Sequence, residues 1–294
     1  GELFPNIFFE LYSRDYWLNK DPKLVDQLFL ILNQIRDKKI HVNEYFDIEK
    51  WAKYFAIMDL TGAYHGSLLD SVKLYFNPET QLFEPIGYDL HKGTGNFDDF
   101  ILSDILDSRR KPKCSWICDH KDLYNIFFRL NDETLNQKFL EKYIYYLQKY
   151  SETNFLKSFL NLHKKELSVL NKAIYQDNSK TDLVRWIGAG FFVYDEEYLI
   201  KRSVLINSRI NSIKLDKIMI SKYNDFLFYE DFLMSNFPVK ASTENCGKSI
   251  NKKNFYFIGR MKFELVTDCS TIKIEDYNNN FVNLELKNNP EINF

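Results

Sequence analysis

This chain has no long apolar run and almost no net charge, and it contains little glycine or histidine. No apolar run approaches the roughly 20 residues that cross a bilayer, so we expect no membrane span in this segment. The formal net charge is −2, which creates no overall field to attract nucleic acid or an anionic membrane. Only 10 glycines and 5 histidines occur among 294 residues, so a stretch that gathers both needs an explanation.

Cysteine is scarce too, with four in the whole chain. Cys114 and Cys118 are four residues apart and His120 follows them, which is half of a zinc-site pattern. A structural zinc site usually has two complete pairs of ligands, and the second pair is missing here. We therefore interpret the cysteines as free thiols, and their number leaves the redox compartment open.

A helical stripe with one misfit follows Asp47. Apolar side chains recur there every three or four residues, which is typical of a buried helical face. Asp59 falls on this stripe, and a carboxylate on an apolar face costs free energy unless it is paired or hydrogen-bonded. Two interpretations stay open, a structural hydrogen bond near the helix end or a functional carboxylate. The stripe consists of Ile48, Trp51, Ala52, Phe55, Asp59 and Gly62.

Residues 72–89 have the pattern of a β-hairpin. The strand-like runs VKLYF (72–76) and LFEPIGYD (82–89) flank NPETQ. Asn-Pro begins a tight turn, because proline presets the backbone of the second turn position. If Phe76 pairs with Leu82, Asp89 comes opposite residue 69.

A register shifted by one residue brings Asp89 opposite Asp70 instead. Directly opposed residues have Cα atoms about 4.5–5.5 Å apart. In both registers Asp89 ends beside residues 69–71, close to the loop that carries His65 and the glycine after it.

Carboxylates gathered at this end of the hairpin favour a cation site. Two carboxylates a few ångströms apart repel unless a cation or a shared proton relieves them, and Mg²⁺ accepts carboxylate oxygens while it holds phosphates. Gly93 and Gly95 follow Asp89, where backbone N–H groups could approach an anion, and Lys73 and Lys92 add point charges. The alternative is a plain surface hairpin with scattered acids and a glycine turn.

The rest of the chain divides into a helical part and a strand-rich part. From about residue 119 the apolar spacing is helical, and the last helix begins with acids, which suit a helix N-terminus. Beyond residue 217, short strand-like runs are separated by Asn-rich turns. We therefore expect an α+β protein, with a mostly helical domain over residues 1–217 and a small β-rich accessory domain over 218–294.

The stretch YFNPETQLFEPIGYDLHKGTG (75–95) resembles the metal-binding end of the CotH family, the spore coat protein H-like atypical protein kinases. Members of that family carry an aromatic-rich strand, a short turn, a Glu-Pro-Ile-type run, an aromatic residue and an aspartate in this order. GAYHG (62–66) resembles the loop before that strand in one branch of the family. The helical stretch after residue 119 is similar to the family's tail, so the resemblance spans about residues 1–215.

The resemblance implies a protein-kinase-like fold and transfer of phosphate from ATP to protein Ser or Thr, assisted by Mg²⁺ or Mn²⁺. It implies that Asp89 binds the metal, as the counterpart of the aspartate in a kinase DFG motif. The family's catalytic base falls on or beside His65, and its metal-binding asparagine falls on Ser71. The catalytic candidates are therefore His65 and Asp59, the metal-binding candidates are Asp89, Asp70 and Ser71, and Lys73 is the candidate contact to the cofactor.

Kinases also need a phosphate-covering glycine loop and a lysine that reaches the α- and β-phosphates, and neither is found here. The chain opens with GELFPNIFFELYS, without methionine or a signal pattern, and we interpret this as a strand-like segment entered midway. We expect a piece of a longer protein that lacks the nucleotide-covering part.

Three functions fit these residues. The first is a CotH-like kinase that acts on a protein substrate. The second is a pseudokinase that has lost catalysis and serves as a structural module, with a protein partner docked on its β-rich tail. The third is metal-dependent phosphoester hydrolysis, which needs the same acids but no adenine pocket. The family also implies a cell-envelope, coat or extracellular location, although the sequence itself leaves the compartment open.

Overall fold

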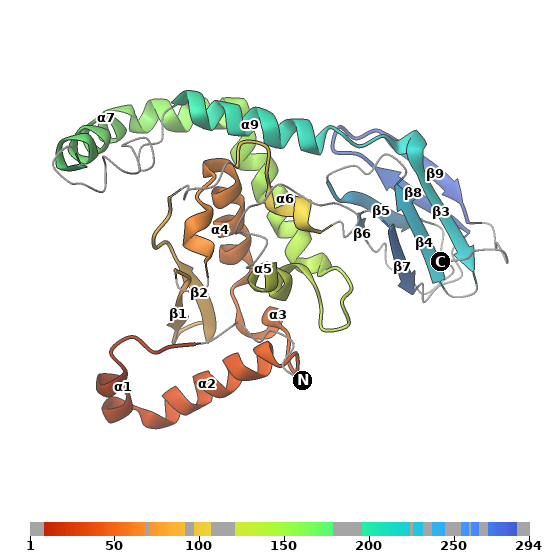
Figure 1. Ribbon diagram of the computed structural model, residues 1–294. Helices are drawn as coiled ribbons and strands as arrows, with labels where there is room; N and C mark the ends of the chain where they lie inside the picture. Colours follow the sequence, from red (N-terminus) through yellow and green to blue (C-terminus); the bar gives the residue numbers. More distant parts are fainter. Residues whose placement is uncertain are drawn as a thin grey trace.

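Helices form the N-terminal part of the molecule and antiparallel strands form its C-terminal part (Figure 1). The computed structural model describes residues 9–68, 71–91, 97–106, 121–178, 196–223, 226–231, 237–244, 254–258, 260–264 and 270–286. The helices are α1 (Arg14–Lys20), α2 (Pro22–Arg36), α3 (Val42–Tyr45), α4 (Ile48–Thr61), α5 (Lys121–Phe128), α6 (Gln137–Ser151), α7 (Thr153–Asn178) and α9 (Glu196–Ile210). The strands are β1 (Lys73–Asn77), β2 (Leu82–Ile86), β3 (Ile218–Tyr223), β4 (Phe226–Asp231), β5 (Val239–Glu244), β6 (Asn254–Phe257), β7 (Arg260–Glu264), β8 (Thr271–Glu275) and β9 (Phe281–Glu285).

Aspartate side chains cap the first two long helices. Asp21 caps α2, and the carboxylate of Asp47 caps α4 by accepting a hydrogen bond of 3.0 Å from the backbone N–H of Lys50. Such caps satisfy N–H groups that have no partner within the helix. α4 ends at Gly62, whose φ of 63° is left-handed, as is common just after a helix. The turn that follows leads directly into the loop before the hairpin.

α4 is the central helix of the helical part, where it packs against α6, α9 and β2 (Figure 1). Its buried face meets an aromatic core, in which the rings of Trp51 and Phe127 stack with centroids 4.6 Å apart. Phe55 lies edge-on to Phe139 of α6, with centroids 5.6 Å apart. Aromatic pairs of this kind add about 0.5–1.5 kcal/mol each beyond their buried area. The predicted stripe is therefore the core face of the helix.

The hairpin of β1 and β2 has the second of the two registers considered above. Phe76 lies opposite Phe83, one residue beyond Leu82. The side chain of Phe83 is buried against Phe46 of the core, and the indole N–H of Trp51 donates to the Phe83 carbonyl oxygen at 3.1 Å. A slip by one residue would turn the Phe83 side chain to the opposite face. Core packing therefore selects this register.

The C-terminal strands begin at Ile218, directly after the expected boundary. They form two antiparallel sheets, one ordered β3-β4-β7 and the other β6-β5-β8-β9. The strand-rich part packs on the helical part, because Phe237, Tyr256 and Ile258 join the core around α4. The side chain of Gln137 at the start of α6 also exchanges two hydrogen bonds with the backbone of Tyr256, at 2.5 and 3.2 Å.

The α+β class is thus confirmed, while the kinase-like fold stays a prediction. Within the described residues no helix combines the length and apolar character needed to cross a bilayer. The strand predicted for the opening residues is wrong over residues 9–13, which are irregular and lead into α1. Residues 1–8, Asp70, Lys92, both glycines after it and the four cysteines lie outside the described residues.

Candidate functional site

The loop before the hairpin and the chain that leaves it meet through their backbones. The short 3₁₀ turn η1 (Tyr64–Ser67) follows α4, and the N–H of His65 donates to the carbonyl oxygen of His91 at 3.2 Å. Asp89 adopts a left-handed φ of 54°, and the N–H of His91 donates back to its carbonyl oxygen at 3.0 Å. Aspartate enters this region more readily than most residues. The chain therefore turns sharply after β2 and brings His91 beside His65.

Gly66 permits this approach because it has no side chain. A Cβ at this position would lie 2.8 Å from the carbonyl oxygen of Tyr88 and 2.5 Å from a methyl group of Leu90. The phenol of Tyr54 on α4 donates to the Gly66 carbonyl oxygen at 2.9 Å and holds the loop from the other side. The glycine of the His-Gly pair thus serves close packing between backbones.

Four side chains converge at the open end of the hairpin. Oδ2 of Asp89 lies 2.8 Å from Nδ1 of His65 and accepts a 3.0 Å hydrogen bond from the hydroxyl of Ser71. Oδ1 of Asp89 lies 3.3 Å from Nε2 of His91. The two imidazole rings stack with centroids 4.0 Å apart. We call His65, Asp89 and His91 the His–Asp–His cluster.

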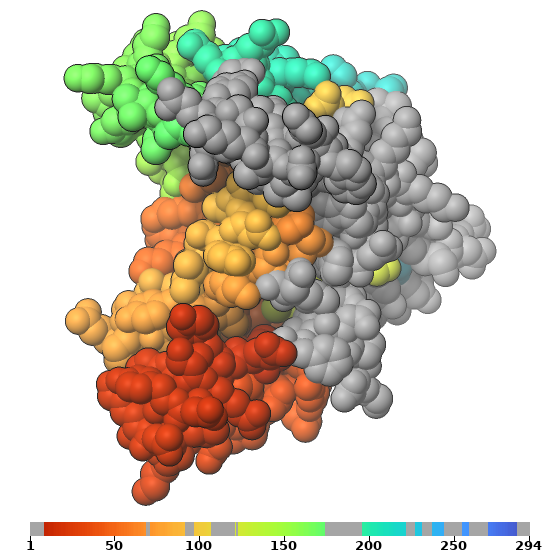
Figure 2. Space-filling view, turned by 60° about the vertical axis from the view of Figure 1, so that its left-hand side comes forward, coloured from red at the N-terminus to blue at the C-terminus, as the bar shows by residue number. Residues whose placement is uncertain are grey.

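The cluster is partly open to solvent. The exposed fractions of the side chains are 28% for His65, 33% for Asp89 and 18% for His91. In the space-filling view the orange hairpin segment reaches the surface between the red N-terminal helices and the green α7 (Figure 2). A small ligand therefore has access to these side chains.

The electrostatics of the cluster favour a neutral imidazole at His91. Burial lowers the pKa of His91 from its ordinary value, and the neighbouring His65 lowers it further, while the Asp89 carboxylate opposes both effects. A neutral imidazole has a free lone pair, which is the form that binds metals or accepts a proton.

Two of the predicted site residues, His65 and Ser71, thus lie at Asp89, as expected from the hairpin. Lys73 begins β1, and its ammonium group lies 5.2 Å from the ring centroid of Tyr88, next to Asp89 in the chain. His91 was not predicted from the sequence, although the run DLH (89–91) places it close to Asp89. Histidine is rare in this chain, and residue 91 is two positions beyond the predicted metal ligand.

Asp59 is not part of this cluster. Its side chain is fully buried, and Oδ1 accepts hydrogen bonds from the phenol of Tyr64 at 2.8 Å and from the backbone N–H of Leu102 at 2.9 Å. The phenol of Tyr143 on α6 donates to Oδ2. Burial raises the pKa of Asp59 to about 6, although these hydrogen bonds and the charge of Arg202 oppose the shift. Of the two interpretations left open by the sequence, the structural one fits this environment.

Arg202 of α9 hydrogen-bonds to backbone carbonyl groups around Asp59. Its guanidinium is buried and donates to the carbonyl oxygen of Asp59 twice, at 2.6 and 3.0 Å. It also donates to the carbonyl oxygens of Phe97 at 2.6 Å and Phe100 at 2.8 Å. One side chain thereby ties α9 to the end of α4 and to the segment that follows the hairpin.

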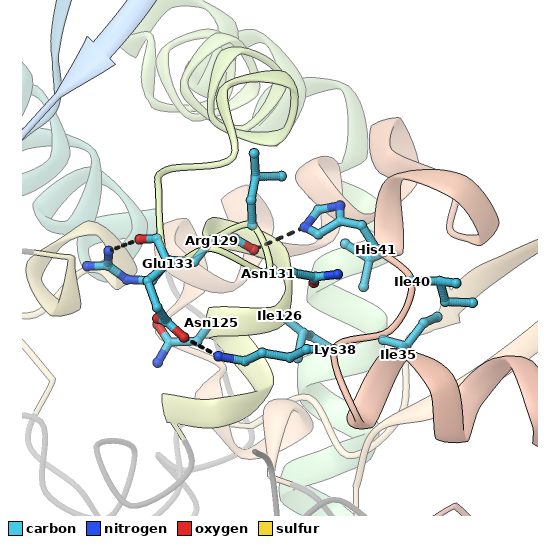
Figure 3. Close-up of a pocket in the computed structure, with 11 residues that line it drawn as sticks. Ile35, Lys38, Ile40, His41, Asn125, Ile126, Arg129, Asn131 and Glu133 are labelled. Carbon is cyan, nitrogen blue, oxygen red and sulfur yellow. Dashed lines mark hydrogen bonds and ion pairs between the residues drawn. The ribbon is translucent and has the colours of Figure 1, made fainter. Parts of the chain in front are cut away.

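A separate pocket lies between the end of α2 and the turn after α5 (Figure 3). Lys38 pairs with Glu133 there, and Nε2 of His41 lies 3.0 Å from the carbonyl oxygen of Arg129. The space in this pocket is about 10 Å³, enough for one water molecule. Ligand pockets usually measure about 300–1,000 Å³, so this pocket cannot accept a nucleotide.

No family model matches the chain, and comparisons with curated proteins and with solved structures also find no match. Membership of the CotH family therefore stays a prediction from the sequence.

The donor atoms of the cluster do not fit the expected Mg²⁺ well. Mg²⁺ prefers near-octahedral oxygen ligands and usually keeps several waters. Here two of the three donor groups are imidazoles, which suit zinc, iron, nickel and copper ions. The cluster can also act without a metal, because a carboxylate beside an imidazole orients the ring for proton transfer.

Proposed function

We propose that this protein is a CotH-like, kinase-related protein and that the open end of its hairpin is the site of phosphate transfer from ATP to a protein hydroxyl. One observation carries the proposal. The carboxylate of Asp89 contacts a side chain from the loop before the hairpin and one from the approach to β1, His65 at 2.8 Å and Ser71 at 3.0 Å. These are the positions that the resemblance assigns to the base and to a metal ligand.

Phosphoryl transfer needs mainly positioning and charge neutralisation, and little covalent chemistry from the protein. Asp89 supplies an anionic group on a backbone that is hydrogen-bonded to its surroundings. Of the two predicted catalytic residues, His65 is the one at this site, since Asp59 is enclosed by its hydrogen-bond partners. His65 therefore acts as a base or as a metal ligand, and these two roles lead to different experimental results.

The test is label transfer from ATP by the protein that contains this chain. Asp89→Asn keeps the shape of the side chain and its tolerance of left-handed backbone, so the variant should fold while transfer to itself or to a co-expressed protein falls at least 100-fold. Glu84→Gln, at an acid of β2 that pairs with Lys50, is the matched control and should keep its activity. Equal transfer by Asp89→Asn and by the unaltered protein would contradict the proposal.

A binding module without catalysis is the second candidate. The hairpin and the chain just after it expose three large side chains, Tyr75 at 48%, Ile86 at 45% and Tyr88 at 53%. Such residues are suited to a protein contact. Tight binding of a protein partner by both the unaltered chain and Asp89→Asn, without label transfer, would favour this function over the kinase.

A further inference from the structure

The ligand chemistry of the His–Asp–His cluster differs from that of an ATP–magnesium site. We propose that His65, Asp89 and His91 bind a first-row transition-metal ion such as Zn²⁺ or Co²⁺, in preference to Mg²⁺ and without any nucleotide. The inference concerns the same site as the proposed function, but metal binding is measured independently of phosphate transfer.

The spacing of the donor atoms suits such an ion. One ligand atom from each of the three residues lies within 4.8 Å of the other two. Tetrahedral ligands at bond lengths of about 2.0–2.2 Å are roughly 3.4 Å apart. The observed separations from the Asp89 oxygens, 2.8 Å to His65 and 3.3 Å to His91, lie close to that value. The two imidazole rings are stacked with an interplanar angle of 23°, so they must rotate to aim their nitrogen lone pairs at one ion.

Backbone contacts hold the three residues in this arrangement before any ion binds. His65 and His91 are joined by a hydrogen bond of 3.2 Å, and the absent side chain of Gly66 lets the two segments touch. The hydroxyl of Ser71 donates to Oδ2 of Asp89 and orients the carboxylate. Partners of this kind usually support metal ligands and raise the affinity of a site. A preorganised set of ligands loses less conformational entropy on binding.

Among the residues that the structure describes, the cluster offers three ligands to the ion. Three protein ligands and a partly exposed position are typical of catalytic metal sites, whereas structural zinc sites are closed by four ligands. The proposal also decides the role of His65. Nδ1 of His65 faces Asp89, and a nitrogen that binds the ion cannot also accept a proton from the substrate. His65 is then a metal ligand and not the catalytic base.

Titration of the metal-free chain tests the proposal directly. The chain is stripped with a chelator and titrated with Zn²⁺, Co²⁺ or Mg²⁺ in the absence of ATP, in a background where the four cysteines are replaced by serine so that thiolates cannot bind the ion. Calorimetry should give one Zn²⁺ per chain, with Mg²⁺ at least 100-fold weaker. Bound Co²⁺ should show visible absorption bands typical of nitrogen and oxygen ligands.

Single variants identify the ligands. His65→Gln, His91→Gln and Asp89→Asn should each lower Zn²⁺ affinity by at least 10- to 100-fold, with circular dichroism to confirm that each variant folds. His163→Gln is the control, because His163 lies on α7 and pairs with Glu166 away from the cluster. Zn²⁺ binding that survives all three ligand variants, or Mg²⁺ binding as tight as Zn²⁺ binding, would overturn the proposal.

The metal and the kinase proposals can fail separately. Label transfer with Mg²⁺ in a chain that does not bind Zn²⁺ would refute the metal inference and leave the kinase. Zn²⁺ binding through the three residues without label transfer would support the metal inference and count against the kinase.

Discussion

A Cβ on residue 66 would lie 2.8 Å from the carbonyl oxygen of Tyr88, so the loop before the hairpin and the exit from it are in backbone contact. This contact explains one of the few glycines in the chain. It also explains how His65 and Asp89, 24 positions apart in the sequence, come to share one site. The strands alone do not reach this far, since the paired residues end at Lys73 and Ile86.

We predict that Gly66→Ala damages the site more than the fold. The added methyl group must push the two segments apart, because its nearest neighbours include a backbone carbonyl oxygen that cannot rotate away. Overpacking of this kind costs about 1–3 kcal/mol. We therefore expect a lower midpoint of unfolding in urea and at least a 10-fold loss of Zn²⁺ affinity.

Gly87→Ala is the matched control on the same hairpin. Among the described residues, a Cβ at Gly87 would meet a methyl group of Leu90 at 3.2 Å, and that side chain can move. This variant should bind Zn²⁺ nearly as well as the unaltered chain. Equal losses in the two variants would show that the contact between Gly66 and Tyr88 has no special role.

The hydroxyl of Ser71 should strengthen Zn²⁺ binding at Asp89 without being essential for it. Its hydroxyl donates to Oδ2 of Asp89 at 3.0 Å, and its side chain is buried. Removal of a group that orients a metal ligand typically lowers affinity by 10- to 100-fold. We expect Ser71→Ala to weaken Zn²⁺ binding by about 10-fold in calorimetry, while Ser71→Thr, which keeps the hydroxyl, restores most of it. Failure of the threonine variant to recover binding would argue against the hydrogen bond as the cause.

Arg202 should be among the most sensitive positions for stability. Its guanidinium is buried and serves carbonyl oxygens at the end of α4 and at residues 97–100. Arg202→Met removes those donors and leaves the buried oxygens without partners, which costs on the order of 3–5 kcal/mol. The expected result is a large fall in the urea midpoint, or a chain that does not fold at all.

Lys201 is the adjacent position on α9 and provides the comparison. Its ammonium group pairs with Asp98 at 2.9 Å on the exposed surface, where an ion pair contributes little to stability because water and salt screen it. Lys201→Met should therefore unfold at nearly the same urea concentration as the unaltered chain. Similar losses in Lys201→Met and Arg202→Met would mean that the buried network does not stabilise the fold.

Local patterns predicted the parts of the fold that depend on neighbouring residues. The helix expected after Asp47 begins there and is capped by the Asp47 side chain, because a helix start is decided within one helical turn. The turn between β1 and β2 was recognised from Asn-Pro, and β3 begins next to the expected boundary. Each of these features is encoded within a few residues.

Features that depend on tertiary packing could not be read from the sequence. The hairpin register was left open because only the burial of Phe83 against Phe46 selects it. Two of the hydrogen-bond donors to the Asp59 carboxylate come from α6 and from the chain after the hairpin, at distances in sequence that no periodicity reveals. His91 was missed for a similar reason, since its approach to His65 depends on the left-handed turn at Asp89.

Because of the titration of Asp59, the free energy of unfolding should decrease as pH rises from about 4 to 6. Burial raises the pKa of this carboxyl from 3.8 to about 6 in the folded state. Between these values the folded chain holds a proton that the unfolded chain has lost, so the free energy of unfolding decreases with increasing pH. The shift corresponds to a decrease on the order of 3 kcal/mol, which is complete above about pH 6.

Asp59→Asn removes this titration and keeps an oxygen that can accept from Leu102. Urea unfolding at pH 4, 5, 6 and 7 measures the difference in unfolding free energy between the unaltered chain and the variant. That difference should change in favour of the variant from pH 4 to 6 and then stay constant. A difference that is the same at all four pH values would contradict a raised pKa at Asp59.

Glu49→Gln provides a control, because the pKa shift of Glu49 has the opposite sign to that of Asp59. A hydrogen bond from Tyr146 and contacts with Lys53 lower the pKa of Glu49 from 4.5 to about 2. Its contribution to stability is therefore present above about pH 4.5 and lost as pH falls toward 2. Between pH 5 and 6 the difference between the unaltered chain and Glu49→Gln should be flat, whereas the difference for Asp59→Asn still changes. The two variants together separate the buried carboxyl from the general effect of pH on the protein.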